Sequence, residues 1–236
     1  MVTNSMNKKI KLLLEKFPLT YSEELGIDLK SKREEEIFKW FLASILFGHR
    51  ISETIAKNTY REFEKEELLT PDKILDAGWD ELVRVLDNGG YVRYDFSTAS
   101  ALLDIMNNLK EKYGSLSNLY KKSKDQMNLE NKLKEFKRVG PVTVNIFLRE
   151  LRDILAVDPL PSDFTIIAAN NLKLIRTKNP EKVLTQLKKI WKKIKIKCKT
   201  FPNFETALLR LDKDYCRKKR CKVCKLLICC TFKKKV

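Results

Sequence analysis

Residues 129–151 read LENKLKEFKRVGPVTVNIFLREL, which is two stretches of helical spacing joined by a short turn at residues 137–141. Gly140 lets the backbone turn and approach a partner closely, and Pro141 suits the first position of the second helix. The free N–H groups at such a helix start bind phosphate well, because they carry the positive end of the helix dipole. An ordinary corner between two helices fits the same residues.

Outward from this turn, almost every segment has the apolar spacing of an α-helix and almost none alternates like a strand. These patterns predict an all-α fold of short helices. Helix starts are expected at four capping signals, two of which include proline at the first helical position: Ser31 with Glu34, Ser52, Thr70-Pro71 and Asn179-Pro180.

The composition is strongly basic, with 48 Lys and Arg against 31 Asp and Glu and a net charge of +17. Such a charge favours a polyanionic partner, although a generally lysine-rich proteome gives the same balance. No apolar run approaches the roughly 20 residues of a membrane helix, and the N-terminus does not resemble a signal peptide. We therefore expect a cytoplasmic protein that binds no membrane.

All six cysteines lie between Cys198 and Cys230, which indicates a metal site rather than a disulfide scaffold. Five of them fall within residues 216–230, and four of these five are separated by four, two and five residues: Cys216, Cys221, Cys224 and Cys230. Four thiolates at such spacing are expected to hold a [4Fe–4S] cluster, with a zinc ion as the alternative. Cys229 is the alternate to Cys230 as fourth ligand.

Together, the hairpin and the cysteines resemble the helix-hairpin-helix DNA glycosylases of the endonuclease III superfamily, which carry an iron–sulfur loop near the C-terminus. The last two cysteine spacings match that loop, and the first is shorter by two residues. The resemblance implies two helical lobes with an active-site cleft between them. A helical barrel would hold residues 30–130, and residues 1–29 and 131–236 would form the second lobe with the hairpin (129–151) and the cysteine loop (216–230).

The resemblance also implies the partner and the reaction. The partner would be double-stranded DNA with a damaged or mismatched base, bound by a monomer that associates with the nucleoid through DNA. The enzyme would hydrolyse the N-glycosidic bond of that base, with a lean toward alkylated or deaminated bases. A helix-hairpin-helix protein that binds DNA without cutting it is the non-enzymatic alternative.

The hairpin residues expected to contact the DNA backbone are Arg138, Val139, Gly140 and Val142. Arg138 stands where the family usually has the first of two glycines. Val142 stands where strand-cleaving members carry a lysine that forms a Schiff base with the sugar. A monofunctional glycosylase is therefore expected, with a combined glycosylase and lyase as the alternative.

The catalytic carboxylate implied by the resemblance is Asp163, with Asp158 as the runner-up. Asp163 leads directly into FTIIAANNL, and the preceding Pro161-Ser162 is similar to the approach in the alkylbase glycosylases. A fixed anion there would stabilise the positive charge that develops on the sugar and orient the attacking water. A simple helix cap is the alternative role for Asp163.

A glycosylase also extrudes its target base and fills the gap left in the stack. The family pattern places His49, the only histidine, at the position of the residue that fills the gap. The loop at residues 88–94 resembles the second DNA-contacting loop, where Tyr91 would wedge against the opposite strand. Phe47 and Tyr94 are the candidates for lining the base pocket. Ser44 replaces the Glu of the adenine-excising members, which argues against adenine excision.

Overall fold

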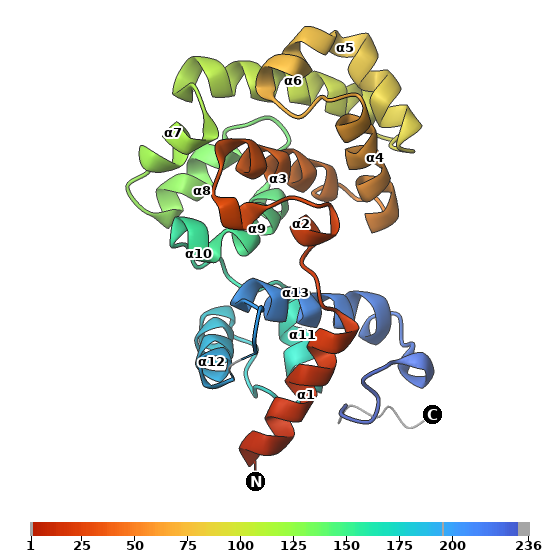
Figure 1. The fold of residues 1–236 in the computed structure, drawn as a ribbon, viewed down its shortest axis with the longest axis vertical. Coiled ribbons are helices and arrows are strands. Elements are labelled where there is room, and N and C mark those ends of the chain that lie inside the picture. Colours follow the sequence, from red (N-terminus) through yellow and green to blue (C-terminus); the bar gives the residue numbers. More distant parts are fainter. Residues whose placement is uncertain (1, 195, 231–236) are drawn as a thin grey trace. The chain divides into compact units, whose positions relative to one another are not determined.

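The computed structural model describes residues 2–194 and 196–230 and divides the chain into two units (Figure 1). The two ends of the chain, up to Glu24 and from Pro159 onward, form unit 1, and Leu25–Asp158 form unit 2. Within the described residues every regular element is a helix, which confirms the expected all-α fold. No helix in this part of the chain has the length and apolar character needed to cross a bilayer.

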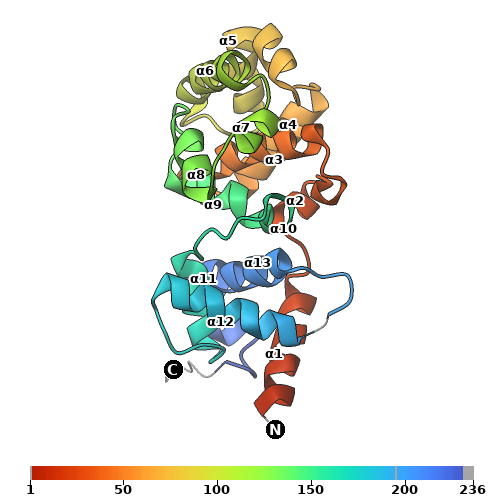
Figure 2. The same ribbon diagram turned by 90° about the vertical axis from the view of Figure 1, so that its left-hand side faces the viewer.

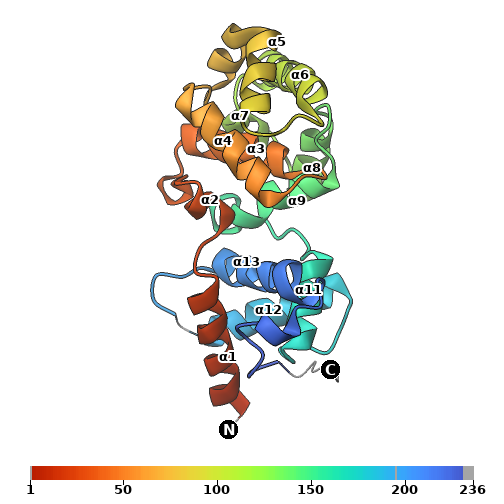
Figure 3. The ribbon, with the colours of Figure 1, turned by 90° about the vertical axis from the view of Figure 1, so that its right-hand side faces the viewer.

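Unit 2 is organised around α3, which is buried along most of its length and packs against η1, α4, α7 and α9. Helices α5 and α6 lie side by side in every view (Figure 1, Figure 2 and Figure 3). The elements of the unit are η1 (Leu29–Ser31), α3 (Glu34–Phe47), α4 (Glu53–Lys65), α5 (Pro71–Asn88), α6 (Asp95–Tyr113), α7 (Leu116–Lys121), α8 (Gln126–Lys134), α9 (Pro141–Glu150) and α10 (Arg152–Leu155).

The hairpin helix α9 belongs to unit 2 because it packs directly on α3. The indole Nε1 of Trp40 donates to the carbonyl of Phe147 at 3.0 Å, and the rings of Phe41 and Phe147 lie 5.2 Å apart. At the end of α3, a Cβ on Gly48 would lie 2.0 Å from Oγ1 of Thr143. The expected boundary at residue 130, with the hairpin in the other lobe, is therefore wrong; the boundary falls after Asp158.

Unit 1 is organised around α13, whose eleven residues are all buried and which packs against α1, α11 and α12. Its apolar core includes Ile10 of α1, Ile166 of α11 and Leu187 of α12. The elements of this unit are α1 (Val2–Lys16), α2 (Tyr21–Glu24), α11 (Asp163–Asn171), α12 (Pro180–Lys193), α13 (Phe201–Leu211), a π-helical turn η2 (Asp212–Cys216) and a 3-10 turn η3 (Cys221–Val223).

Three of the four expected helix starts are confirmed. The side chains of Ser52, Thr70 and Asn179 each accept the N–H three residues later, as N-caps do. The capping box of Ser31 and Glu34 is wrong, because α3 begins after Arg33. The Glu34 carboxylate instead accepts the N–H of Ser117 at the start of α7, at 3.1 Å.

The contact at Gly48 yields a test of the packing between α3 and α9. We expect Gly48→Ala to lower the free energy of unfolding by about 1–3 kcal/mol, because the new methyl group must displace Thr143. Gly140→Ala is the matched control, since no atom lies within 4 Å of its Cβ position and its φ of −90° suits alanine. Urea denaturation followed by circular dichroism measures both; equal losses would contradict the tight contact.

Candidate functional site

The hairpin turn keeps the geometry that a glycine would give it, although Arg138 occupies the position. Arg138 has a φ of 64°, in the left-handed region, at a cost of about 1 kcal/mol for a residue with a side chain. Gly140 follows as the N-cap of α9 with extended backbone. The turn between α8 and α9 is therefore a tight hairpin. Arg138 adds an exposed positive charge to this turn, which a glycine at the same position would lack.

The exposed part of the hairpin is the start of α9. The first N–H groups of a helix have no partner within it, and here no side chain of the N-cap residue accepts from them. Val142 is 63% exposed beside them. Val139 is buried and its N–H donates to the carbonyl of Phe136 at 3.0 Å, so neither group is available to DNA. The expected contact of Val139 with DNA is therefore not supported. Val139 instead stabilises the turn through its buried side chain and its hydrogen bond to Phe136.

Next to the hairpin, unit 2 forms an aromatic and basic cluster of His49, Tyr91, Arg93, Tyr94 and Arg138. The His49 imidazole stacks on the Tyr94 ring, with centroids 5.4 Å apart and planes 29° apart. The guanidinium carbons of Arg93 and Arg138 lie 5.4 and 6.0 Å from the centre of the Tyr94 ring. The structure thus brings together the expected gap-filling residue, a pocket residue and the hairpin cation.

The expected wedge role of Tyr91 is wrong. Its side chain is buried, and its hydroxyl donates to the carbonyl of Leu46 at 2.8 Å. Burial accordingly raises the pKa of Tyr91. Val92, which was not among the predicted site residues, is 62% exposed in the same loop. The sequence signal for Val92 was its place in the loop two residues after the glycine pair, between Tyr91 and Arg93.

His49 is half-buried, and this burial lowers its pKa; the nearby charge of Arg138 lowers the pKa further. The imidazole is therefore neutral at pH 7 and able to stack as an uncharged ring. Phe47, the other expected pocket residue, is half-buried with its ring 6.4 Å from that of Trp40.

Asp163 is the first residue of α11 in unit 1, and it is exposed. The N-cap is Ser162, whose hydroxyl accepts the N–H of Thr165 at 3.5 Å. The alternative that Asp163 is only a helix cap is therefore wrong. Asp158, the runner-up, pairs with Arg152 at 3.6 Å, and its N–H donates to Gln126. These contacts give Asp158 a structural role at the end of unit 2.

The cysteine segment of unit 1, residues 212–230, lines one side of a cavity of about 260 Å³, and α11 lines another. The cavity is lined by the four expected ligands and not by Cys229: Cys216, Cys221, Cys224 and Cys230. Among the described residues no three potential ligand side chains are gathered tightly enough to hold a single metal ion. The four thiols instead line one cavity together with residues of α11.

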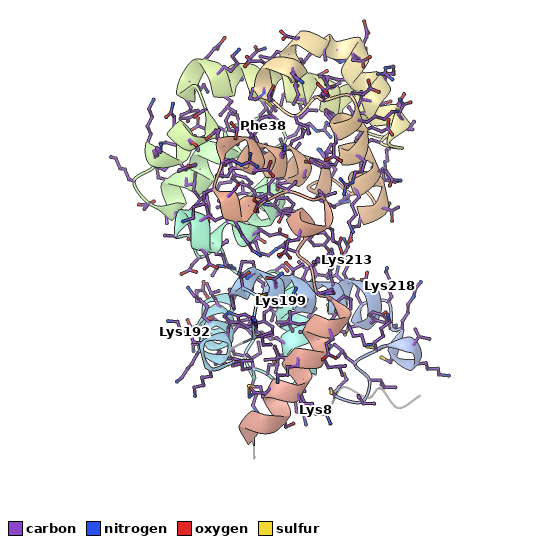
Figure 4. The ribbon with its side chains drawn as sticks, viewed as in Figure 1. Lys8, Phe38, Lys192, Lys199, Lys213 and Lys218 are labelled. Carbon is purple, nitrogen blue, oxygen red and sulfur yellow. The ribbon has the colours of Figure 1, made fainter. Side chains whose placement is uncertain are left out.

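Burial raises the pKa of Cys216 to about 11, and it also raises the pKa of Cys224. Negative charge on Cys230 raises both pKa values further. The basic side chains of Lys213 and Lys218 project from the same segment, after α13 (Figure 4).

No protein-family model and no curated protein matches this chain. Among solved structures, it is similar to the H. pylori 3-methyladenine DNA glycosylase MagIII, which was crystallised with bound 1,N6-ethenoadenine. The TM-score is 0.54 at 12% sequence identity, and the match covers 89% of this chain and 98% of that one. The two proteins share a fold. At 12% identity this similarity shows a common fold and assigns no role to any residue of this chain.

The cluster around His49 yields a direct test of its electrostatics. We expect Arg138→Gln to raise the pKa of His49 toward its ordinary value, because one of the two causes of the lowering is removed. NMR titration reports this pKa without ambiguity, since the chain has one histidine. Arg50→Gln, an exposed neighbour, is the control, and equal shifts from both variants would refute a specific effect of Arg138.

The sign of the pH dependence of stability follows from the same lowered pKa. Below about 6.5 the unfolded chain binds a proton at His49 more readily than the folded chain does. The stabilising contribution of neutral His49 is thus present above that pH and is lost as the pH falls through the folded pKa.

Proposed function

We propose that this protein is a monofunctional DNA glycosylase of base-excision repair. The observation that carries the proposal is the exposed carboxylate of Asp163, free of any capping role, at the start of a helix in a fold shared with a glycosylase. Asp163 is the catalytic residue in this proposal, and Asp158 is not.

The proposed reaction is hydrolysis of the bond between the base and C1′ of the deoxyribose. As the bond breaks, the base leaves with its electron pair and positive charge builds on the sugar. The Asp163 carboxylate stabilises that charge and orients the attacking water. The water oxygen bonds to C1′ as its proton passes to the carboxylate, which releases it to the departing base or to solvent. Val142 has no amine to form a Schiff base, so the product is an intact strand with an abasic site.

The hairpin of unit 2 supplies the grip on the DNA backbone. The uncapped start of α9 offers N–H groups to a phosphate, and the exposed Arg138 adds a cation beside them. These contacts do not read sequence, which suits an enzyme that recognises a damaged base in any context. The neutral His49 is the candidate to fill the gap left by that base.

We further propose alkylated purines as the substrate class. MagIII is named for 3-methyladenine and was crystallised with 1,N6-ethenoadenine, and this chain shares its fold. Ser44, at the position of the glutamate in adenine-excising members, is buried and donates its hydroxyl to the carbonyl of Trp40 at 2.7 Å. It therefore offers no acid for the excision of unmodified adenine.

The cysteine segment fits a [4Fe–4S] cluster, since four thiols line one cavity and thiolates are the ligands of such clusters. Cys216, Cys221, Cys224 and Cys230 would hold it. Bound there, the cluster would link the four cysteines through iron–thiolate bonds and so fix the conformation of the cysteine segment. Zinc remains the alternative for the same thiols.

An assay of base release from defined duplexes tests the proposed reaction. We expect the enzyme to release 3-methyladenine or 1,N6-ethenoadenine and to leave strands that break only after alkali. Asp163→Asn should lower the single-turnover rate at least a hundredfold, because the charge on the sugar loses its counterion. Asp158→Asn is the matched control and should stay within a few-fold of the wild type.

Three other results are informative in that assay. Tight binding without release of any base would favour a DNA-binding protein that is not an enzyme. Strand cleavage without alkali would contradict the inference from Val142. Release confined to uracil or hypoxanthine would move the substrate class to deaminated bases.

A pair of cysteine variants tests the proposed cluster independently of activity. Cys230→Ser should lower the iron and sulfide content and the visible absorbance, because it removes a thiol that lines the cavity. Cys229→Ser should keep both near the wild-type values. A colourless wild-type protein that binds zinc would contradict the cluster, and iron loss only in Cys229→Ser would reverse the choice of ligand.

A further inference from the structure

The cysteine segment touches the helix that begins with Asp163 at both of that helix's ends. At the start of α11, the guanidinium of Arg217 lies 3.9 Å from the centre of the Phe164 ring. At the end of α11, Sγ of Cys230 lies 3.7 Å from the carbonyl oxygen of Asn171. Phe164 directly follows Asp163, and Arg217 directly follows Cys216.

Arg217 is held on a second side by a buried carboxylate. Its Nε lies 3.9 Å from Oδ2 of Asp212, which is 1% exposed. Both carboxylate oxygens of Asp212 lack a hydrogen-bond partner among the described residues, and Asp212 lines the cysteine cavity. The Arg217 guanidinium therefore lies between an aromatic ring of α11 and an acid of the cysteine segment.

This arrangement couples the shape of the cysteine segment to the start of α11. A shift of Cys216 moves the backbone of Arg217, and the guanidinium carries that shift to Phe164 through a cation–π contact. Ile167 and Asn171 of α11 line the same cavity, so a group bound in the cavity would also restrict the movement of α11. Interactions one step away from a functional group commonly set its orientation.

We propose that Arg217 is a positioning residue, which fixes Asp163 at the start of α11 through Phe164 when the four cysteines hold their cluster. The inference rests on the proposed function, because it assigns the positioned carboxylate to catalysis. The cysteine segment would then affect the rate of base release through the position of Asp163, in addition to fixing the conformation of its own basic residues.

Five variants of the full-length, cluster-loaded protein test the inference, the fifth being the conservative change Arg217→Lys. Arg217→Ala removes the cation and Phe164→Leu removes the ring without changing the charge; the double variant removes both. Arg176→Ala is the matched control, an exposed arginine beyond the other end of α11. Iron content is measured first, so that the variants are compared at equal loading.

Hydrogen exchange of amides in residues 163–168 and single-turnover base release at saturating DNA are the two readouts. We expect faster exchange and an approximately tenfold lower rate in each single variant. The double variant should fall no further, because both changes break one contact. Arg176→Ala should match the wild type, and Arg217→Lys should recover part of the rate, since an ammonium can also lie over the ring.

The inference is overturned if exchange at the start of α11 is unchanged in Arg217→Ala. It is also overturned if that variant weakens only DNA affinity, which would make Arg217 a phosphate contact, or if the two single effects on the rate add. If Arg217→Ala loses its iron, Phe164→Leu and Arg217→Lys carry the test. If the wild type releases no base, the proposed function fails, while the exchange data still decide whether Arg217 couples the two segments.

Discussion

The packing of α3 against α9 is the constraint on which the arrangement of unit 2 depends. Trp40 donates its indole N–H to a backbone carbonyl of α9, and Gly48 leaves no room for a side chain beside Thr143. A buried indole without a partner and an overpacked helix contact are both costly, so α3 and α9 hold one register. The end of α3 carries His49, and the start of α9 follows Arg138. Their proximity is therefore a result of helix packing rather than of a flexible loop.

Local signals in the sequence predicted three of the four expected helix starts. The caps at Ser52, Thr70 and Asn179 depend on contacts three residues apart, and they form as expected. Features set by distant contacts were missed. The hairpin joins unit 2 because Trp40 reaches Phe147, 107 residues away, and Tyr91 is buried because its hydroxyl finds the carbonyl of Leu46. No periodicity or capping rule encodes such partners.

The candidate site in unit 1 depends partly on local sequence spacing and partly on contacts between residues far apart in the chain. The cysteine spacing identified four thiols that line one cavity, because a ligand set confined to fifteen residues depends little on the rest of the fold. The neighbours of that cavity were not predictable. Helix α11 reaches it through α13, which packs on α11 and leads directly into the turn that carries Asp212 and Cys216. The buried helix α13 thus brings α11, which begins with Asp163, next to the cysteine segment.

Arg138 shows how one substitution in a hairpin changes more than the turn. A glycine there would adopt the left-handed backbone without strain, whereas arginine accepts a cost of about 1 kcal/mol. In return the turn carries a guanidinium that reaches Tyr94 and lowers the pKa of His49, which burial already lowers. A neutral imidazole enters a base stack as an aromatic ring, without the desolvation cost that a cation would meet. For a protein that grips DNA through this hairpin, the same arginine would then serve both the phosphate contact and the state of the residue that fills the gap.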